Sequence, residues 1–233
     1  MKALVFAAGF GERMRPLTDH TPKPLLEAGG KALIVWHLHK LAALGIEDVV
    51  INTSWLAGQF PQTLGDGSDF ELRLHYAYEG ASPLETGGGM LNALPLLGDA
   101  PFIAVNGDIW CDADFADLPR EPAGLAHLLM VDNPAHNPDG DFVLADDGKL
   151  HSDGESRLTF SGIGVYRPAL FNGWREVIGA AAGSELTPPR FKLAPLLRSA
   201  MAGGQVTGTR HPGHWADVGT PERLQALDAL LKA

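Results

Sequence analysis

A glycine loop with two cations, within residues 4–24, is the part of the sequence best suited to chemistry. The segment reads LVFAAGFGERMRPLTDHTPKP, so an apolar run leads into Gly9 and Gly11. Because glycine has no Cβ, its backbone N–H can approach an anion closely, and the planar guanidinium of Arg13 suits phosphate oxygens. Lys23 lies between two prolines that restrict its backbone, which holds its ammonium near one position. Two glycines alone would fit a tight turn equally well, but the full combination predicts a phosphate site.

An aspartate follows another apolar run, in the string VNGD at residues 105–108. Residues 102–106 fit a buried strand, and the ligands of open α/β sheets bind at the carboxyl ends of strands. Asp108 at such an end offers carboxylate oxygen, which hard divalent cations prefer. A lone aspartate is more often a turn residue, so this interpretation requires a second ligand from elsewhere in the chain.

Three consecutive glycines open a predicted helix in the string LETGGG, at residues 84–89. The first N–H groups of a helix have no partner within the helix, so glycines there expose amides that can receive a phosphate or the edge of a nucleobase. The alternative is a flexible helix start without any ligand.

The glycine loop resembles the signature of the sugar-1-phosphate nucleotidylyltransferases, G-x-G-x-R-x-x-P-L-T followed by P-K-P. The matching residues are Gly9, Gly11, Arg13, Pro16, Leu17, Thr18, Pro22, Lys23 and Pro24. Glu12 departs from the pattern, because many members have a small hydroxyl residue there. A second string, HWADVGT at residues 214–220, is similar to the W-x-D-x-G-T element of the same family. The resemblance implies that Asp217 is a metal ligand together with Asp108, and that the ion is Mg²⁺.

The resemblance also implies roles in the transfer of a nucleotidyl group from a nucleoside triphosphate to a sugar 1-phosphate. Arg13 would brace the β- and γ-phosphates and Lys23 the α-phosphate, so these two are the predicted catalytic residues. The predicted nucleotide-binding residues are Ala7, Ala8, Gly9, Gly11, Glu85, Gly88 and Asn106. Since Glu85 can accept a hydrogen bond from uracil as readily as from guanine, the LETGGG motif does not identify the base.

The sugar-binding residues are assigned by the same resemblance. FSGIGVY at residues 160–166 resembles the family's strand beneath the sugar, and NPDGDF at 137–142 resembles the loop that contacts its hydroxyls. The predicted sugar-binding residues are Gly140, Asp141, Gly162 and Lys192. Several relatives have a Glu-Lys-Pro element whose lysine holds the sugar phosphate, and this sequence lacks it. Arg157 and Lys192 are the cations considered in its place.

Further strings, including VDNPAHNPDGDF and FKLAPLLRSAMAGG, are similar to the uridylyltransferases that act on N-acetylmuramate 1-phosphate in peptidoglycan recycling. This resemblance favours UTP and N-acetylmuramate 1-phosphate as substrates. Guanylyl transfer from GTP to mannose 1-phosphate is the main alternative, and uridylyl or thymidylyl transfer from UTP or dTTP to another hexose 1-phosphate is a further one. The lactyl carboxylate of muramate requires a cation, for which Arg190 and Lys192 are candidates on charge alone.

Two other classes of protein use part of this pattern. A nicotinamide-dependent oxidoreductase requires a third glycine where Met14 stands, and it has no role for the P-K-P string. A non-catalytic nucleotide sensor on the same fold would bind nucleotide without turnover. The presence of both Asp108 and Asp217 disfavours the sensor.

Strands and helices alternate along the chain in the way that a parallel sheet requires. Strands are expected at residues 2–7, 49–52, 72–78, 102–106, 126–131 and 158–166. Helices are expected at 32–44, 84–97 and 220–231, with a further apolar helical face at 190–201. Gly162 and Gly164, inside the last strand, suggest close approach by a ligand or backbone. The predicted fold is α/β, a three-layer, Rossmann-like, mostly parallel sheet, which the resemblance identifies as the nucleotide-diphospho-sugar transferase fold.

Length and cysteine content restrict the organisation of the chain. For 233 residues we expect one domain at 1–233, with a nucleotide-binding part at about 1–112 and a sugar-binding part at about 113–233. Cys111 is the single cysteine, which excludes an internal disulfide and argues against a cysteine-based zinc site. We expect Cys111 to be a small buried residue. The sequence does not specify an oligomeric state.

Charge and hydropathy exclude several partners. The net charge of −10 disfavours nucleic acid and anionic membranes, whereas the first 31 residues hold five Lys or Arg against three Asp or Glu and favour a small polyphosphate. No apolar run approaches the ~20 residues that span a bilayer. Residues 1–8 lack the features of a signal peptide, so we expect a cytoplasmic location.

Overall fold

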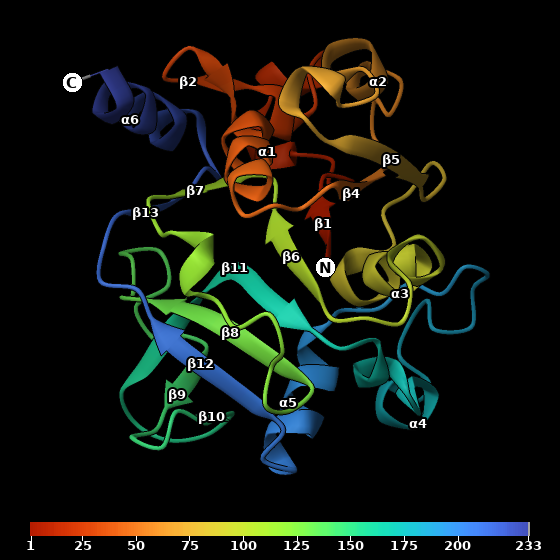
Figure 1. Cartoon of the computed structure of the whole chain (residues 1–233), viewed down its shortest axis with the longest axis vertical. Helices are drawn as coiled ribbons and strands as arrows, with labels where there is room; N and C mark the ends of the chain where they lie inside the picture. The colour runs from red at the N-terminus through yellow and green to blue at the C-terminus, as the bar shows by residue number, and fades with distance from the viewer. Residues whose placement is uncertain (233) are drawn as a thin grey trace.

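A computed structural model describes residues 1–232 and shows strands that alternate with helices (Figure 1). The strands are β1 (Lys2–Phe6), β2 (Glu27–Ala28), β3 (Lys31–Ala32), β4 (Asp48–Thr53), β5 (Arg73–Tyr78), β6 (Phe102–Asn106), β7 (Ile109–Cys111), β8 (Ala126–Val131), β9 (Phe142–Leu144), β10 (Leu150–His151), β11 (Arg157–Tyr166), β12 (Val206–Arg210) and β13 (Trp215–Asp217). The α-helices are α1 (Leu33–Ala43), α2 (Gln59–Leu64), α3 (Glu85–Leu97), α4 (Trp174–Ile178), α5 (Ala194–Ala202) and α6 (Pro221–Lys232). Short 3-10 helices lie at Glu12–Met14, Leu17–Asp19, Lys23–Leu25, Ser68–Phe70, Phe115–Asp117 and Pro168–Phe171.

Strand β1 lies in the middle of the parallel part of the main sheet, between β4 and β6, and β5 continues the sheet beyond β4. Ala3, Leu4 and Val5 are fully buried, as expected for a continuous apolar strand covered on both faces. Ala3 and Val5 share a core cluster with Leu38 of α1, whereas Leu4 shares another with Met90 of α3. Helices therefore cover both faces of the sheet, and the predicted three-layer α/β architecture is confirmed.

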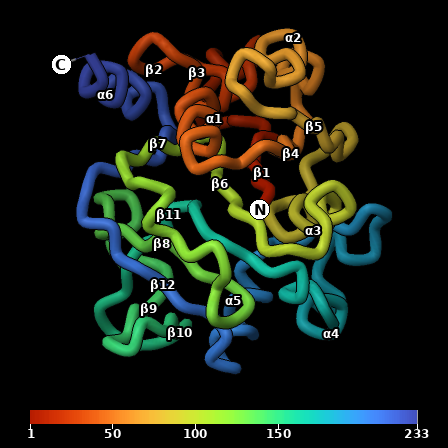
Figure 2. Tube along the Cα trace, viewed as in Figure 1, coloured from red at the N-terminus to blue at the C-terminus, as the bar shows by residue number. Residues whose placement is uncertain are grey.

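The other part of the main sheet is mixed. β11 runs antiparallel to β6, β8 runs antiparallel to β11, and β12 runs parallel to β8 (Figure 2). β9 and β10 extend the sheet beyond β11 as short strands. The register of β11 against β8 shifts between Phe160 and Gly164, and Gly162 within this shift has φ 84°. α4 and α5 share a core cluster with α3 and cover this part of the sheet.

Helix α6 lies beside β2 (Figure 1). Leu227 of α6 is buried in a third core cluster with Met14 and Ala28. Asp228 Oδ1 accepts a 2.9 Å hydrogen bond from the N–H of Gly29. These contacts fix α6 beside the glycine loop.

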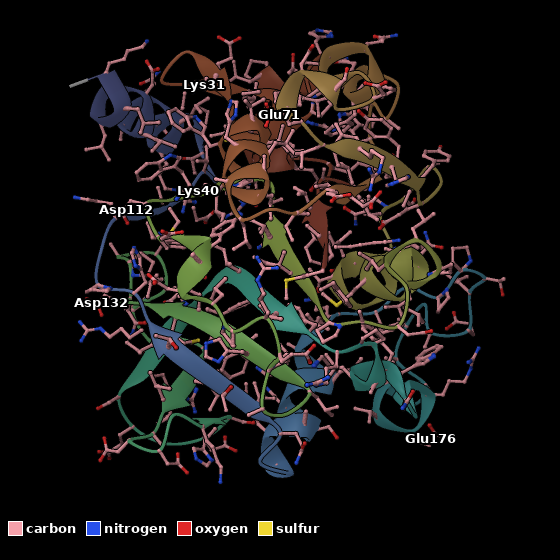
Figure 3. The ribbon with its side chains drawn as sticks, in the orientation of Figure 1. Lys31, Lys40, Glu71, Asp112, Asp132 and Glu176 are labelled. Carbon is pink, nitrogen blue, oxygen red and sulfur yellow. The ribbon has the colours of Figure 1, made fainter. Side chains whose placement is uncertain are left out.

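Charged side chains lie around the outside of the molecule. Lys31, Glu71, Asp132 and Glu176 are all exposed, and Asp132 and Glu176 lie at the margin of the molecule in Figure 3. Among residues 1–232, no helix combines the length and the apolar character needed to cross a membrane.

All predicted strands and helices are present. β6 and β8 have the predicted bounds, and the bounds of the others are slightly shifted. The helix expected from residue 190 begins only at Ala194, because residues 190–193 run alongside the start of α3. The sequence analysis missed several short elements that carry little periodic signal: β2, β3, β7, β9, β10, β13, α2 and α4. It also missed β12, which at five residues is as long as β1 and β6.

Candidate functional site

A cavity of about 590 Å³ opens at the carboxyl ends of β1, β4 and β6, the edge at which an open α/β sheet binds ligands. Its wall contains nine residues predicted from the sequence, namely Ala7, Ala8, Gly9, Gly11, Arg13, Lys23, Glu85, Asn106 and Asp108. The predicted residues outside this wall are Gly88, Gly140, Asp141, Gly162, Lys192 and Asp217. The structure therefore brings the glycine loop, the end of β6 and the start of α3 together around one cavity.

Gly9 and Gly11 differ in what surrounds them. A Cβ at Gly9 would meet no atom within 4 Å, so the fold does not require glycine there. Gly11 has φ 67°, and a Cβ there would lie 2.8 Å from Cγ2 of Thr18. The Thr18 hydroxyl also donates a 2.8 Å hydrogen bond to the Gly11 carbonyl. Gly11 therefore shapes the loop, whereas Gly9 leaves open space in the cavity.

A buried polar pair, Asn52 and Glu79, also lines the cavity and was missed by the sequence analysis. Asn52 Nδ2 donates to Glu79 Oε1 at 2.6 Å, and Asn52 Oδ1 accepts from the N–H of Ala7 at 2.7 Å. Glu79 Oε2 accepts from the N–H of Leu84 at 2.8 Å. Burial raises the pKa of Glu79 above its ordinary value, although these hydrogen bonds oppose the shift. The pair connects the end of β1 to the LETGGG motif, and the polar asparagine within the apolar string VVINT is the signal that marks it.

The glycines of the LETGGG motif have a different role from the predicted one. The N–H groups of Gly87 and Gly88 donate to the carbonyl of Phe191, at 2.9 and 3.0 Å, so they are not open to a phosphate or a base. Gly88 is buried, and a Cβ there would overlap the carbonyl oxygen of Pro189. The glycines let residues 189–193 pass close to α3, and Gly88 lies outside the cavity wall. Glu85 does line the cavity, with φ 64°, and its contact with the base stays a prediction.

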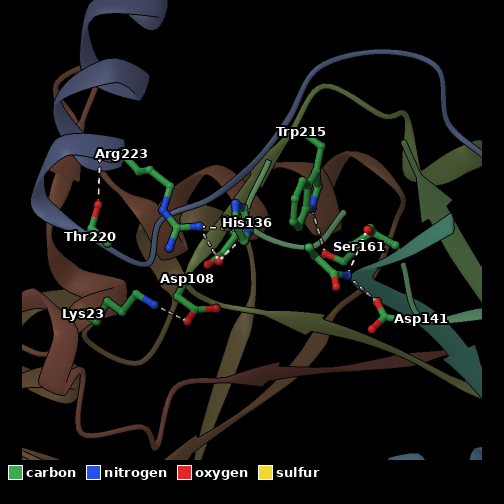
Figure 4. A network of polar contacts seen from close by, with 11 residues as sticks. Lys23, Asp108, His136, Asp141, Ser161, Trp215, Thr220 and Arg223 are labelled. Carbon is green, nitrogen blue, oxygen red and sulfur yellow. Dashed lines mark hydrogen bonds and ion pairs between the residues drawn. The ribbon is translucent and has the colours of Figure 1, made fainter. Parts of the chain in front are cut away.

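Lys23 and Asp108 form an ion pair in the cavity wall (Figure 4). Lys23 Nζ lies 2.6 Å from Asp108 Oδ2, and the two side chains are 9% and 35% exposed. A buried ammonium requires a paired anion, and Asp108 supplies it. The structure thus places the predicted catalytic lysine in direct contact with a predicted metal ligand.

The ladder of β7 and β13 brings Asp217 next to Asp108. Asp217 is paired with Ile109, the residue that follows Asp108. The N–H of Val218 also donates to the carbonyl of Asp108 at 3.0 Å. The two aspartates predicted as metal ligands are therefore neighbours in space, although about a hundred residues separate them.

The two carboxylates fit the ligand preference of Mg²⁺. This ion takes oxygen ligands and is commonly held by one or two carboxylates together with substrate phosphates and water. The contacts of Asp108 and Asp217 with protein cations in residues 1–232 use one carboxylate oxygen of each, Oδ2. Each side chain thus keeps an oxygen for an ion, and Mg²⁺ binding stays a prediction.

Two further side chains, both missed by the sequence analysis, contact Asp217. Nη1 of Arg223, in the first turn of α6, lies 2.8 Å from Asp217 Oδ2 and 3.0 Å from Nε2 of His136. His136 Nε2 lies 3.3 Å from the same carboxylate oxygen, and its ring stacks on Trp215 with centroids 6.5 Å apart. Trp215 Nε1 in turn donates to the carbonyl of Ser161 at 2.9 Å. The β8–β9 loop, β11, β13 and α6 therefore converge on Asp217 (Figure 4).

The predicted sugar-binding residues do not all lie together. Asp141 Oδ2 accepts a 2.8 Å hydrogen bond from the N–H of Phe160, which ties the β8–β9 loop to β11. A Cβ at Gly162 would lie 2.6 Å from Nδ2 of Asn106, so this glycine makes room for a residue of the cavity wall. Lys192 instead lines a second cavity of about 400 Å³, beside the start of α3. Lys192 therefore lies outside the wall of the first cavity, although Glu85 lines both cavities.

A second group of possible metal-binding side chains consists of Cys111, Asp112 and His211, whose ligand atoms lie within 4.8 Å of one another. His211 Nε2 and Asp112 Oδ1 are 2.5 Å apart, which is a hydrogen-bond contact. Cys111 is buried in a core cluster, as predicted, and burial raises the pKa of its thiol. These contacts are those of a His–Asp hydrogen bond beside a buried thiol.

Comparison with known proteins identifies the family. Residues 2–138, more than half of the chain, match the family model described as Nucleotidyl transferase. The chain belongs to the nucleotidyl transferase family. The resemblance that the glycine loop suggested is therefore confirmed.

Two relatives of this nucleotidyl transferase match it over nearly their full lengths. A protein of Neisseria meningitidis serogroup B, named N-acetylmuramate alpha-1-phosphate uridylyltransferase, is 48% identical over 240 residues, which cover 100% of this chain and 99% of that protein. A protein of Caulobacter vibrioides with the same name is 32% identical over 244 residues, which cover 98% and 96%. A solved structure of a putative glucose-1-phosphate thymidylyltransferase from Bacillus anthracis, in complex with a sucrose, aligns with a TM-score of 0.81 and 22% identity, covering 100% of this chain and 95% of that one. This last likeness concerns the fold, and it agrees with the predicted fold class.

Proposed function

We propose that this nucleotidyl transferase forms UDP-N-acetylmuramate and pyrophosphate from UTP and N-acetylmuramate 1-phosphate, with Mg²⁺ as cofactor. The observation that carries the proposal is the 48% identity, over both full lengths, to the uridylyltransferase of Neisseria meningitidis. The cavity supports it, because predicted phosphate-binding residues lie there beside two neighbouring carboxylates. We further propose that the reaction serves peptidoglycan recycling in the cytoplasm.

The proposed chemistry is an in-line displacement at phosphorus. An oxygen of the sugar phosphate attacks the α-phosphorus of UTP and forms a new P–O bond. The bond from the α-phosphorus to the oxygen that bridges to the β-phosphate breaks, and its electron pair leaves with pyrophosphate. Because the attacking phosphate is already ionised at neutral pH, no general base is required, and the protein has to bring two anions together and stabilise the developing charge.

The residues of the cavity divide this work. Gly9 leaves space for the triphosphate, and Arg13 braces the β- and γ-phosphates that become the leaving group. Lys23, held near one position by Asp108, stabilises charge on the α-phosphate. Mg²⁺ held by Asp108 and Asp217 would neutralise phosphate oxygens as a Lewis acid.

The test is a matrix of substrates with Mg²⁺, read by pyrophosphate release. UTP, GTP and dTTP are each combined with the 1-phosphates of N-acetylmuramate, N-acetylglucosamine, glucose and mannose. We expect turnover with UTP and N-acetylmuramate 1-phosphate. Turnover confined to GTP and mannose 1-phosphate would replace the proposal with a guanylyltransferase, and a preference for another hexose would change the acceptor. Nucleotide binding without turnover in every mixture would favour the sensor.

The variant Lys23→Ala tests the role of the ion pair. We expect its turnover to fall by roughly 10²-fold or more, because a fixed charge next to the reacting phosphate is lost. The matched control is Lys149→Ala, which removes an exposed lysine paired with Asp147 in the turn between β9 and β10. Circular dichroism of both variants checks the fold, and a Lys23→Ala enzyme with most of its rate would contradict the assignment.

A further inference from the structure

The phosphate of the acceptor sugar has no cation assigned to it in the proposed reaction. This phosphate has to reach the α-phosphorus near Asp108 and Asp217, where two carboxylates repel it. The chain lacks the Glu-Lys-Pro lysine, and Lys192 lies in the second cavity. Arg157 faces the exposed carboxylate of Asp153 at 3.9 Å. Neither cation that the sequence offered contacts the pair of aspartates.

Arg223 does contact one member of this pair, Asp217, and part of its guanidinium is unused. Among the hydrogen bonds of residues 1–232, the guanidinium takes part through Nη1 alone, which contacts Asp217 and His136. The side chain is 25% exposed, so part of it is accessible to solvent. The Nε–H and Nη2–H groups lie on one edge of the planar fork, and such an edge matches two oxygens of a phosphate.

The guanidinium of Arg223 lies against Gly219, a residue of the cavity wall. Gly219 is part of the cavity wall, and a Cβ there would overlap Nη2 of Arg223 and lie 2.9 Å from its Cζ. Gly219 has no positive φ, so its backbone conformation does not require glycine. The absence of a side chain at residue 219 thus leaves the space that the guanidinium occupies.

The elements around Arg223 hold it in position. α6 is fixed to the beginning of the chain by the buried Leu227 and by the hydrogen bond between Asp228 and Gly29. His136 contacts Nη1 on the other side and stacks on Trp215 (Figure 4). Because the helix holds the cation in place, little conformational entropy is lost when the cation binds its ligand.

From this geometry we infer that Arg223 binds the phosphate of the acceptor sugar through Nε and Nη2, while Nη1 stays on Asp217. Arg223 thereby supplies positive charge to a phosphate that would otherwise face only the carboxylates. It orients the attacking phosphate next to the metal-binding carboxylates. This inference rests on the proposed function, since it concerns the acceptor of that reaction.

The test measures ligand binding as well as turnover. Calorimetry compares N-acetylmuramate 1-phosphate with unphosphorylated N-acetylmuramate, each in the presence of a non-hydrolysable UTP analogue. The proteins are the wild type, Arg223→Gln, Arg223→Lys and the control Lys232→Gln, which removes a cation from the same helix. In Arg223→Gln we expect the Kd and the KM of the 1-phosphate to rise roughly ten- to hundredfold, because the variant loses hydrogen bonds from a charged group, whose contribution to affinity corresponds to such a factor. Arg223→Lys should recover part of this loss, and the KM of UTP should not change.

The free sugar distinguishes the phosphate from the lactyl carboxylate, since it keeps the carboxylate and lacks the phosphate. An equal loss of affinity for both ligands would place Arg223 on the sugar or its carboxylate and overturn the inference, as would an unchanged Kd for the 1-phosphate. A wild-type enzyme that uses no sugar 1-phosphate would refute the proposed function instead. Thermal unfolding of each variant establishes that it is folded. If Arg223→Gln is not folded, the comparison of the two ligands is made with Arg223→Lys.

Discussion

A buried histidine next to β7 should make the stability of the protein depend on pH. His37 of α1 is 2% exposed, and its Nε2 lies 2.8 Å from the carbonyl of Ile109, the residue after Asp108. Nδ1 has no hydrogen-bond partner among residues 1–232. Burial lowers the pKa of His37 from 6.5 to about 4, because the charged imidazolium is poorly solvated there. The perturbation to test is His37→Gln, which keeps a donor for Ile109 and removes the titrating group.

The magnitude follows from the two pKa values. The folded protein keeps His37 neutral until the pH approaches 4, whereas the unfolded chain takes up a proton below about 6.5. Stability from the neutral histidine is complete above pH 6.5 and is lost as the pH falls toward 4. At pH 5.0 the loss amounts to roughly 2 kcal/mol, and it reaches about 3 kcal/mol below the folded pKa.

The assay is urea unfolding at pH 7.5 and pH 5.0, followed by circular dichroism. The free energy of unfolding of the wild type should fall between these pH values by roughly 2 kcal/mol more than that of His37→Gln. His39→Gln is the matched control, because His39 is an exposed histidine on the same helix, and this variant should behave like the wild type. Equal losses in wild type and His37→Gln would refute the reasoning, since the pH dependence would then come from other groups.

Three further predictions concern glycines with different surroundings. Gly9→Ala should leave the thermal midpoint unchanged and lower kcat/KM for UTP roughly ten- to hundredfold, because its Cβ enters open space in the cavity. Gly11→Ala should instead lose roughly 1–3 kcal/mol of stability, because of the positive φ of Gly11 and the contact of the new Cβ with Thr18. A lower thermal midpoint for Gly9→Ala than for Gly11→Ala would show that the roles are reversed. Gly88→Ala should lose a similar amount of stability, because its Cβ displaces residues 189–193 from α3. Urea unfolding measures this loss, and an unaltered midpoint would mean that α3 does not hold this segment.

The parts predicted from the sequence are those with a strong local signal. The strands β1, β4 and β6 are continuous apolar runs bounded by glycine or polar residues. Such short runs are typical of strands that are buried on both faces of a sheet. The glycine loop was recognisable because Gly9, Gly11 and Arg13 stand close together in one string. Local spacing therefore predicted the fold class and the residues of the cavity wall contributed by the loop.

The parts that were missed depend on contacts between distant segments. β7 and β13 are each three residues long, and only their pairing places Asp217 beside Asp108. The LETGGG glycines looked like an anion site because nothing nearby in sequence satisfies their amides, which the distant Phe191 carbonyl does. Arg223 lies on a helix with ordinary amphipathic spacing, so its contact with Asp217 appears only once α6 is in place. Sequence patterns report local periodicity, and these partners are set by tertiary packing.

The attachment of α6 to the beginning of the chain has a consequence for synthesis on the ribosome. The glycine loop is made first, whereas Asp217 and Arg223 follow it by roughly two hundred residues. At typical elongation rates this interval lasts roughly 10 to 40 seconds. During that time a nascent chain has Arg13, Lys23 and eventually Asp108, but it lacks the second carboxylate and the arginine beside it. We therefore expect nascent chains to gain nucleotide contacts early and the ability to join nucleotide and sugar only after α6 has emerged.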